Sequence, residues 1–257
     1  MHNLDFLVLL FLAAGAAASA RWKKLTPAAA VTGAVCGTVI YMGDGFRGLA
    51  LLALFFVLGT AATALGPSPH QSTRRTGQVI ANGGIAAIAG LLALIFPAGR
   101  QIFTLVLAAS LSSATADTLS SELGMVYGRR FFNILTLKAD ERGLDGVISL
   151  EGLLFGAIGS ALVAAVFLII PAPPASFFFV VPGTHHQHSP VFSSSDAVLS
   201  NSQAFLILLI AGTIGNLADS LLGALFERRG LLTNDQVNFG NTLIAAACAG
   251  VLACIHA

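Results

Sequence analysis

Residues 101–124 read QIFTLVLAASLSSATADTLSSELG, and this stretch decides the fold class. It is long and apolar enough for a transmembrane helix, which needs about 20 mostly apolar residues. The whole chain shares this character, because charged residues make up only 10% of its 257 residues, against roughly 25% in soluble domains. The composition indicates an integral membrane protein. It excludes a soluble domain, a disordered chain and a nucleic-acid binder with a basic face.

The apolar pattern predicts an all-α fold, a polytopic membrane helical bundle of about eight transmembrane helices, with seven or nine as the alternatives. We expect residues 1–257 to form a single transmembrane domain. Pro171, Pro173 and Pro174 end the sixth span, because proline blocks helix continuation, so an outer loop should cover about 171–202. The expected spans are about 4–20, 26–43, 47–65, 79–97, 101–124, 147–170, 203–226 and 238–256.

The first span has an alternative interpretation as a cleaved signal peptide. A secretory signal begins with Lys or Arg, whereas this chain has Asp5 at its leading end and Arg21, Lys23 and Lys24 after the apolar run. We therefore expect a retained first helix whose N-terminus lies outside.

The charges of the loops predict the direction of the spans. Cytoplasmic loops collect Lys and Arg, and the eight-span arrangement puts eleven of the 13 basic residues on one side, all except Arg47 and Arg100. This distribution places both termini outside and three polar loops, 66–78, 125–146 and 227–237, in the cytoplasm. We expect a multi-pass location in a bacterial-type cell membrane.

Ionisable and amide side chains inside the spans gather at this same membrane face, and such groups usually mark function. Asp117 and Glu122 lie late in the fifth span, while Asn216 and Asp219 lie late in the seventh. Serine and glycine residues recur beside them at helical spacing, for which helix packing is the alternative explanation. A carboxylate is a costly way to join helices. The set also includes, near the starts of the fourth, sixth and eighth spans, Asn82, Glu151, Asn238 and Asn241.

Carboxylates beside amides and arginines suit a magnesium–polyphosphate complex. Mg²⁺ prefers oxygen ligands and is usually held by one or two carboxylates plus substrate phosphates. We therefore expect Asp117, Glu122 and Asp219 to be catalytic residues and metal ligands. Arginine can bind phosphate oxygens with two parallel hydrogen bonds, although the charge bias of cytoplasmic loops alone explains many basic residues. The expected phosphate clamp comprises Arg74, Arg75, Arg129, Arg130, Lys138, Arg142, Arg228 and Arg229.

Two other motif classes contribute little. The sequence has no Walker-type Gly-Lys-Ser/Thr loop, which excludes the nucleotide cradle of soluble kinases. His185, His186 and His188 have a spacing that could bind a metal, but they lie in a Pro/Ser-rich outer loop that we interpret as solvated.

An ordered set of segments matches a known pattern: Ala114-Thr115-Ala116-Asp117-Thr118, Ser121-Glu122-Leu123-Gly124, the stretch from Gly143 to Gly152, Asp219 to Ala224, Leu232-Thr233-Asn234-Asp235, and Arg75, Gln78 and Ala81-Asn82-Gly83. Together these segments resemble an integral membrane family once called domain of unknown function 92. The resemblance covers roughly residues 30–256. That family includes the plant and cyanobacterial phytyl-phosphate kinases and animal transmembrane protein 19, and it is distantly similar to the CTP-dependent polyprenol kinases.

The resemblance implies phosphorylation of an isoprenyl monophosphate to the diphosphate, with CTP or another nucleoside triphosphate as donor and Mg²⁺ as cofactor. Its implied partners are membrane lipid, the isoprenyl phosphate and the nucleotide, with no nucleic acid. The loop after Gly124 departs from the usual Gly/Pro-rich pattern, which affects the individual phosphate contacts. The resemblance extends the expected substrate- and nucleotide-binding set to Gln78, Asn234 and Asp235, beside Asn82, Asn216 and Asn238.

Two functions from other classes remain as alternatives. The first is an ion-coupled transporter of a small molecule or lipid, since acidic residues and glycine-interrupted helices also describe carriers. Such a carrier should place its coupling groups near the membrane midplane, whereas here they crowd one face. The second is a lipid-binding or assembly protein without turnover. The kinase hypothesis requires the carboxyl groups of Asp117 and Asp219 to lie within about 10 Å, the reach of two ligands around one magnesium and its waters.

Overall fold

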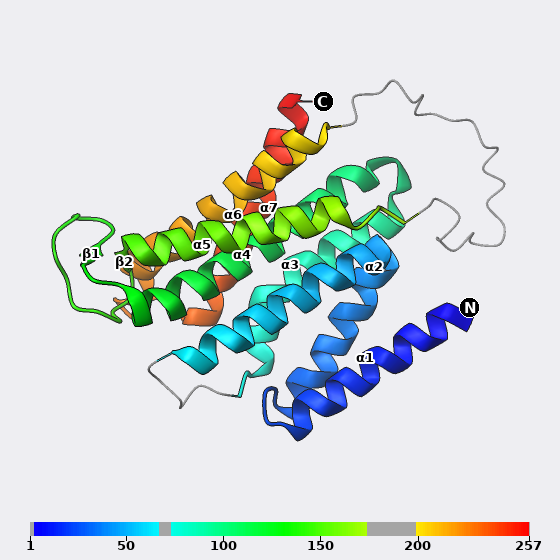
Figure 1. The fold of residues 1–257 in the computed structure, drawn as a ribbon, viewed down its shortest axis with the longest axis horizontal. Coiled ribbons are helices and arrows are strands. Elements are labelled where there is room, and N and C mark those ends of the chain that lie inside the picture. The colour runs from blue at the N-terminus through cyan, green and yellow to red at the C-terminus, as the bar shows by residue number, and fades with distance from the viewer. Residues whose placement is uncertain (1–2, 67–72, 174–198, 257) are drawn as a thin grey trace.

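The computed structural model describes residues 3–66, 73–173 and 199–256, and these form a helical bundle (Figure 1). Its elements are α1 (Asn3–Arg21), α2 (Pro27–Leu65), α3 (Thr76–Ile95), the short 3-10 helix η2 (Pro97–Gly99), α4 (Arg100–Tyr127), β1 (Phe131–Asn133), β2 (Val147–Ser149), α5 (Leu150–Ile169), α6 (Asn201–Leu222), the π-helix η4 (Gly223–Glu227) and α7 (Asn234–His256).

Helix α2 reverses its direction halfway. Gly45 has φ 61° and ψ −145°, a conformation that glycine adopts and other residues rarely do. The backbone N–H of Thr26 donates to the carbonyl of Arg74 at 3.0 Å, so the start of α2 lies beside the segment that follows its end. Its two arms coincide with the expected spans 26–43 and 47–65 (Figure 1). The described residues contain seven α-helices when both arms are counted as α2, so the predicted count of about eight is not exact; the backbone between the two arms is not helical at Gly45.

Side-chain caps begin several helices. The hydroxyl of Thr26 accepts from the N–H of Ala29 at 3.2 Å, and Pro27 fills the first helical position, where its missing N–H is not needed. Ser149 accepts from the N–H of Gly152 at 3.0 Å at the start of α5. These caps satisfy N–H groups that have no partner inside the helix.

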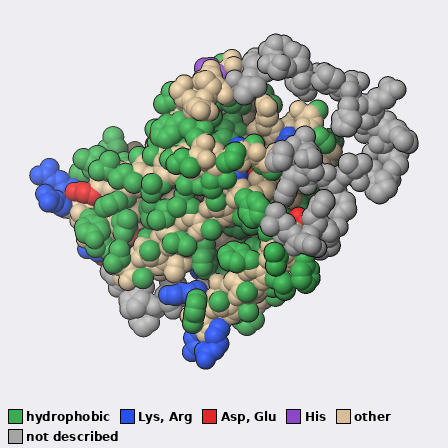
Figure 2. Space-filling model, turned by 45° about the vertical axis from the view of Figure 1, so that its right-hand side comes forward, with side chains coloured by type: hydrophobic (Ala, Val, Ile, Leu, Met, Phe, Trp, Pro, Cys, Tyr) green, Lys and Arg blue, Asp and Glu red, His purple; other side chains and the backbone are tan. Residues whose placement is uncertain are grey.

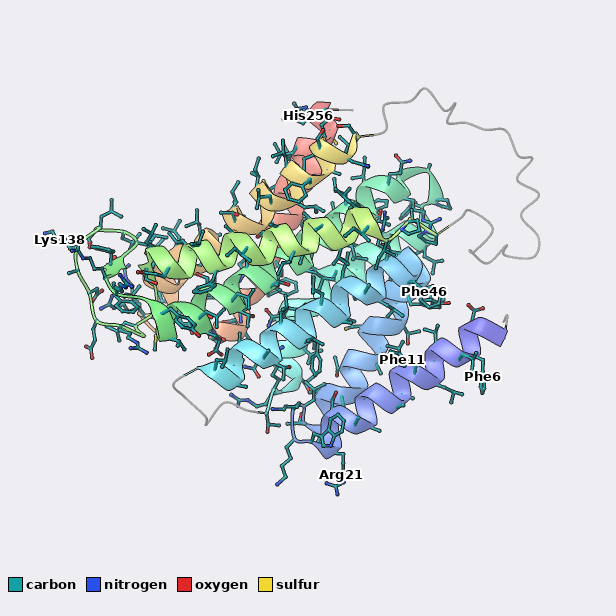
Figure 3. All side chains as sticks on the ribbon, in the orientation of Figure 1. Phe6, Phe11, Arg21, Phe46, Lys138 and His256 are labelled. Carbon is teal, nitrogen blue, oxygen red and sulfur yellow. The ribbon has the colours of Figure 1, made fainter. Side chains whose placement is uncertain are left out.

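Six helices, α2 to α7, are long and apolar enough to cross a membrane by length and composition, with mean hydropathies from 1.4 to 2.4. Large apolar side chains point outward from the bundle, as Phe6 and Phe11 do on α1 (Figure 3). Figure 2 shows apolar side chains spread over the flank, while the Lys and Arg side chains stand at projecting ends. The chain is therefore an integral membrane helical protein. The first described residues of α1 and the end of α7 both lie away from β1 and β2 (Figure 1).

Helix α4 is the centre of the bundle, with α2, α3, α5, α6 and α7 packed around it. Leu107, Ala108 and Leu111 are fully buried within the main apolar core. This placement explains why its polar side chains meet other helices: every face of α4 in the core contacts protein rather than lipid.

Two short strands form a structure that the sequence did not predict. β1 pairs antiparallel with β2, with Phe131 opposite Ser149 and Asn133 opposite Val147. The chain between α4 and α5, which we expected to be an irregular polar loop, is thus a β-hairpin over residues 128–149. Figure 3 shows Lys138 at the outer edge of this hairpin.

Close contact between α2 and α3 generates a stability prediction. A Cβ atom on Gly43 would overlap the backbone of Gly90, whereas a Cβ on Gly15 would have no neighbour within 4 Å. Gly43→Ala should destabilise the protein by about 1–3 kcal/mol through overpacking, and Gly15→Ala should not. Thermal unfolding in detergent measures both. Equal unfolding temperatures for the two variants would contradict this packing.

Candidate functional site

A pocket of about 250 Å³ lies where α4, α6, the β-hairpin and α7 come together. Four acidic side chains line it: Asp117 from α4, Asp219 from α6, Asp145 from the hairpin and Glu227 from η4. We call this site the acid pocket. Polar side chains from the same elements complete the lining, among them Ser120, Ser121, Asn216, Ser220 and Asn234.

Asp117 and Asp219 line this pocket together, and their carboxyl groups lie close enough to interact. The kinase hypothesis requires such proximity. Asn241 Nδ2 on α7 donates to Asp219 Oδ1 at 2.6 Å, and Ser113 Oγ on α4 donates to Asn241 Oδ1 at 2.9 Å. Two carboxylates close together repel each other, so a bound cation or a shared proton would stabilise the pair.

Glycines let these helices come close together. A Cβ on Gly215 of α6 would overlap Ser113 Oγ, and a Cβ on Gly156 of α5 would overlap Asn216 Nδ2. Ser112 Oγ donates to the carbonyl of Leu208 at 3.2 Å across α4 and α6. The serine and glycine residues of α4, α5 and α6 therefore serve helix packing. Asp117 and Asp219 instead line the pocket.

Two of the four pocket acids were not singled out from the sequence. Glu227 ends the π-helix η4, a form of backbone that is frequent at functional sites, but in the sequence it resembles an ordinary loop charge next to Arg228. Asp145 lies in the hairpin before Gly146, whose φ of 75° and tight packing against Ala224 admit only glycine. In the sequence, Gly143 and Gly146 are the residues that could have indicated a tight turn around Asp145.

One member of the expected phosphate clamp is an anchor for the hairpin. Arg228 Nη1 lies 2.6 Å from Asp140 Oδ2, and Asn133 Nδ2 donates to the same oxygen at 3.1 Å. The hydrogen bond from Arg228 and then that from Asn133 hold the pKa of the Asp140 carboxyl well below its usual range, and the same bond raises the pKa of Arg228. The guanidinium of Arg142 lies 5.8 Å from the centre of the Phe131 ring.

The exposed members of the expected phosphate clamp are Arg129, Arg130, Lys138, Arg142, Arg228 and Arg229, and Arg75 also lies exposed at the start of α3.

Glu122 does not line the acid pocket. Its Oε1 accepts from Thr63 Oγ1 on α2 at 3.0 Å, and Arg74 lies close enough to interact with it. Burial lowers the pKa of Arg74, and Glu122 partly offsets this effect. Five residues of helix separate Glu122 from Asp117, which turns their side chains about 140° apart. The expected three-carboxylate set therefore does not meet at one point, and the described residues contain no group of three His, Cys, Asp or Glu side chains placed to hold a metal.

The remaining expected residues lie at the starts of α3 and α7. Gln78 Oε1 accepts from the backbone N–H of Arg75 at 3.0 Å, and Asn82 Nδ2 donates to the carbonyl of Gln78 at 2.9 Å. Asp235 packs against Gly77, where the positive end of the α3 dipole favours a carboxylate. These side chains shape the helix ends around the pocket rather than lining it.

Only Asn234 of the α7 residues reaches the acid pocket. Its Oδ1 accepts from Asn238 Nδ2 at 3.4 Å. Glu151 lies beside the backbone N–H of Arg129 at 3.4 Å. The amide oxygens of Asn82 and Asn238 are buried and accept no hydrogen bond within the described part of the chain. His185, His186 and His188 lie outside the described residues, as does most of the expected outer loop.

The donor set of the acid pocket fits Mg²⁺. The ion takes hard oxygen ligands and is commonly held by one or two protein carboxylates, with phosphate and water oxygens completing the shell. Asp117 and Asp219 supply that pair, and the amide groups of Asn216 and Asn234 lie on the same wall. A third protein carboxylate is not needed for such a site.

Comparison with known proteins gives consistent matches. Residues 9–246 match the family described as Integral membrane protein DUF92. An uncharacterized membrane protein of Methanocaldococcus jannaschii is 29% identical over 226 residues, 86% of this chain and 82% of that protein. An uncharacterized membrane protein of Synechocystis sp. is 30% identical over 245 residues, 91% of this chain and 84% of that one. Protein VTE6, chloroplastic, of Arabidopsis thaliana is 29% identical over 230 residues, but they make up 60% of its length. No solved structure matches the chain.

The anchor of the hairpin can be tested by hydrogen exchange. Asp140→Asn should speed amide exchange across residues 133–146 roughly two- to fivefold, the scale of one exposed ion pair. Because the pKa of Asp140 is lowered in the folded protein, the ion pair stabilises the hairpin above the usual pKa of an aspartate and weakens as pH falls below it. The matched control is Glu141→Gln, one residue away, whose side chain makes no hydrogen bond with a described residue. Equal exchange in the two variants would show that Arg228 does not hold the hairpin.

Proposed function

This chain belongs to the integral membrane protein family DUF92, and from this membership and the acid pocket we propose that it is a membrane-embedded kinase. Its proposed reaction converts an isoprenyl monophosphate to the diphosphate, with CTP or another nucleoside triphosphate as the donor and Mg²⁺ as the cofactor. The observation that carries the proposal is the convergence of Asp117 and Asp219, from two different helices, in one pocket at the loop end of the bundle.

In this proposal Asp117 and Asp219 hold the metal. The metal they would hold would supply charge neutralisation for the phosphates, the main requirement of phosphoryl transfer. Asn241 fixes the Asp219 carboxylate through its 2.6 Å hydrogen bond. Asn216 and Asn234 line the pocket, where their amide groups can donate to phosphate oxygens.

The transferred group moves between two phosphates that meet in the pocket. A terminal oxygen of the isoprenyl monophosphate forms a new bond to the γ-phosphorus, the bond from that phosphorus to the β-phosphate oxygen breaks, and the nucleoside diphosphate leaves. Exposed cations at this end, such as Arg129 and Arg130, raise the local concentration of the anionic nucleotide. Hairpin residues such as Asp145 and Val147 form part of the pocket lining, where they would limit access of water, which competes as the acceptor.

The acceptor can reach the pocket from the bilayer. Leu150 and Leu154 on α5 and Leu217 and Leu221 on α6 are exposed apolar side chains near the pocket end of their helices. A prenyl chain can lie against these side chains while its phosphate enters the acid pocket. In the proposed orientation this end faces the cytoplasm, where nucleotide is available, and both chain ends face outward.

Loss of either aspartate should abolish the proposed reaction. With purified protein, Mg²⁺, CTP and geranylgeranyl monophosphate, we expect diphosphate product from the unchanged chain. Asp117→Asn and Asp219→Asn should each lower the rate by about 100-fold or more, the scale of losing one electrostatic contact to the transferring group. Product formation from radiolabelled nucleotide, separated by chromatography, measures this.

Two controls sharpen the result. Glu141→Gln changes an acid outside the pocket and should keep the rate. Glu122→Gln should lower thermal stability, because it removes the negative charge that interacts with the half-buried Arg74, without changing the dependence of the rate on Mg²⁺ concentration. Full activity in both aspartate variants would overturn the metal assignment. Substrate flux into liposomes without nucleotide consumption would favour the transporter instead.

A further inference from the structure

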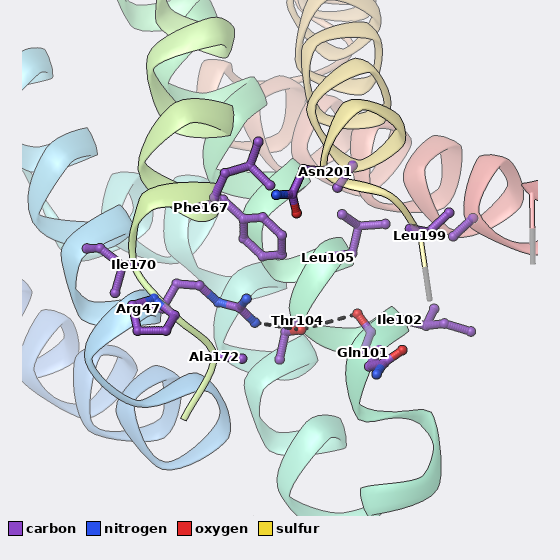
Figure 4. A pocket seen from close by; sticks show the side chains of 14 residues that line it. Arg47, Gln101, Ile102, Thr104, Leu105, Phe167, Ile170, Ala172, Leu199 and Asn201 are labelled. Atoms are coloured by element: carbon purple, nitrogen blue, oxygen red, sulfur yellow. Dashed lines mark hydrogen bonds between the residues drawn. The ribbon is translucent and has the colours of Figure 1, made fainter. Parts of the chain in front are cut away.

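The end of the bundle away from the acid pocket contains a second pocket of about 360 Å³ (Figure 4). It lies between the turn of α2, the start of α4, the end of α5 and the start of α6. Its volume falls in the range of small-molecule sites. We call it the arginine pocket and define it by Arg47, Gln101, Thr104, Leu105, Phe167 and Asn201.

Arg47 gives this pocket an unusual lining. The residue is 8% exposed, and a guanidinium carries five N–H donors. Its Nε donates to both carboxylate oxygens of Asp44 at 3.1 and 3.0 Å, and its Nη2 donates to Asp44 Oδ1 at 2.7 Å and to Thr104 Oγ1 at 3.1 Å. Figure 4 shows the guanidinium between Thr104 and Phe167. The two N–H groups on Nη1 donate to no residue in the described part of the chain, and donors left unused in a buried site favour an acceptor from outside.

Two cations and one anion gather around this pocket. Asp44 is fully buried and bonded to Arg47. Arg100 is a second guanidinium close enough to interact with both Asp44 and Arg47. Helix α6 begins at Asn201 on the pocket wall, which adds the positive end of a helix dipole. Arg47 and Arg100 are also the two basic residues that the loop-charge distribution left on the side opposite the others.

The other walls are apolar. The ring of Phe167 lies 4.1 Å from the Arg47 guanidinium carbon, and Leu105, Leu168 and Ala253 continue the surface. A free inorganic anion would leave this apolar surface wet, whereas a molecule with one chain would cover it. We propose that the arginine pocket binds a single-chain amphiphile with an anionic head, whose head accepts from Arg47 Nη1 and whose chain lies along Phe167, Leu168 and Ala253. The inference does not depend on the kinase reaction, because no residue is shared with the acid pocket.

Photolabelling of the full-length protein tests the site. The probe is hexadecanoate with a diazirine in its chain, added to purified protein in nanodiscs of neutral lipid. We expect saturable labelling on the end of α5 and the start of α4, displaced by unlabelled hexadecanoate. The same probe with an alcohol in place of the carboxylate should label at least about tenfold less, because it lacks the charge-assisted hydrogen bond. Displacement by acetate as effective as that by hexadecanoate would show a site for a free anion and overturn the proposal.

Substitutions can test the contribution of the charged groups and that of the cavity separately. Asp44→Asn combined with Arg47→Gln removes the bonded charge pair together, and labelling should fall about tenfold. Ala253→Leu fills the cavity and should reduce labelling to a similar extent while the charges stay. The matched control is Ala34→Leu, which narrows an alanine-lined apolar groove between α1 and α2, and it should label like the unchanged protein. Labelling unchanged in both pocket variants, or confined to other helices, would overturn the assignment.

Discussion

The central constraint of this bundle is that two carboxyl groups, those of Asp117 and Asp219, lie half-buried in one pocket of an apolar protein. Moving a charge out of water is expensive, and bringing two like charges together adds to that cost. The surrounding structure accommodates them: Asn241 donates to Asp219, Ser113 donates to Asn241, and Gly215 allows α6 to approach α4. Because α4 is surrounded by other helices, its polar stripe is shielded from lipid. The metal that we propose between these residues would relieve their repulsion.

The two ends of the bundle handle buried charge differently. At the hairpin end the acids gather and the basic side chains stand outside, with the Arg228–Asp140 ion pair joining the hairpin to η4. At the opposite end a buried cation and a buried anion are bonded directly, since Arg47 and Asp44 make an ion pair three residues apart across the turn at Gly45. The acid pocket at the hairpin end suits a bound cation together with anionic substrates. The arginine pocket at the opposite end suits an anion that accepts hydrogen bonds from the two N–H groups on Arg47 Nη1.

The sequence predicted the parts of the structure that repeat along the chain. Apolar length placed the helices, and helix direction brought Asp117, Asn216, Asp219 and Asn241 to one end, because these follow from local pattern alone. What it missed depends on three-dimensional detail. Nothing local shows that the two arms of α2 join directly at Gly45, or that residues 131–133 and 147–149 pair as strands. Glu122 lies at nearly the same depth along α4 as Asp117, but its side chain points to another side of the helix. The sequence indicates depth in the membrane, whereas it does not indicate which side of α4 faces the pocket, because every side of this helix is covered by protein. Asp145 and Glu227 reach the pocket only through the fold of the hairpin and η4.

The central claim, that Asp117 and Asp219 together bind a divalent cation, can be measured without any catalytic assay. Mn²⁺ can replace Mg²⁺ at oxygen-ligand sites and is followed directly by electron paramagnetic resonance, in the presence of a non-hydrolysable nucleoside triphosphate analogue. We predict one bound Mn²⁺ per chain above that held by the nucleotide alone, weakened about tenfold or more when Asp219 is replaced by Asn. Mn²⁺ binding of equal affinity and stoichiometry in the unchanged and substituted proteins would contradict the account.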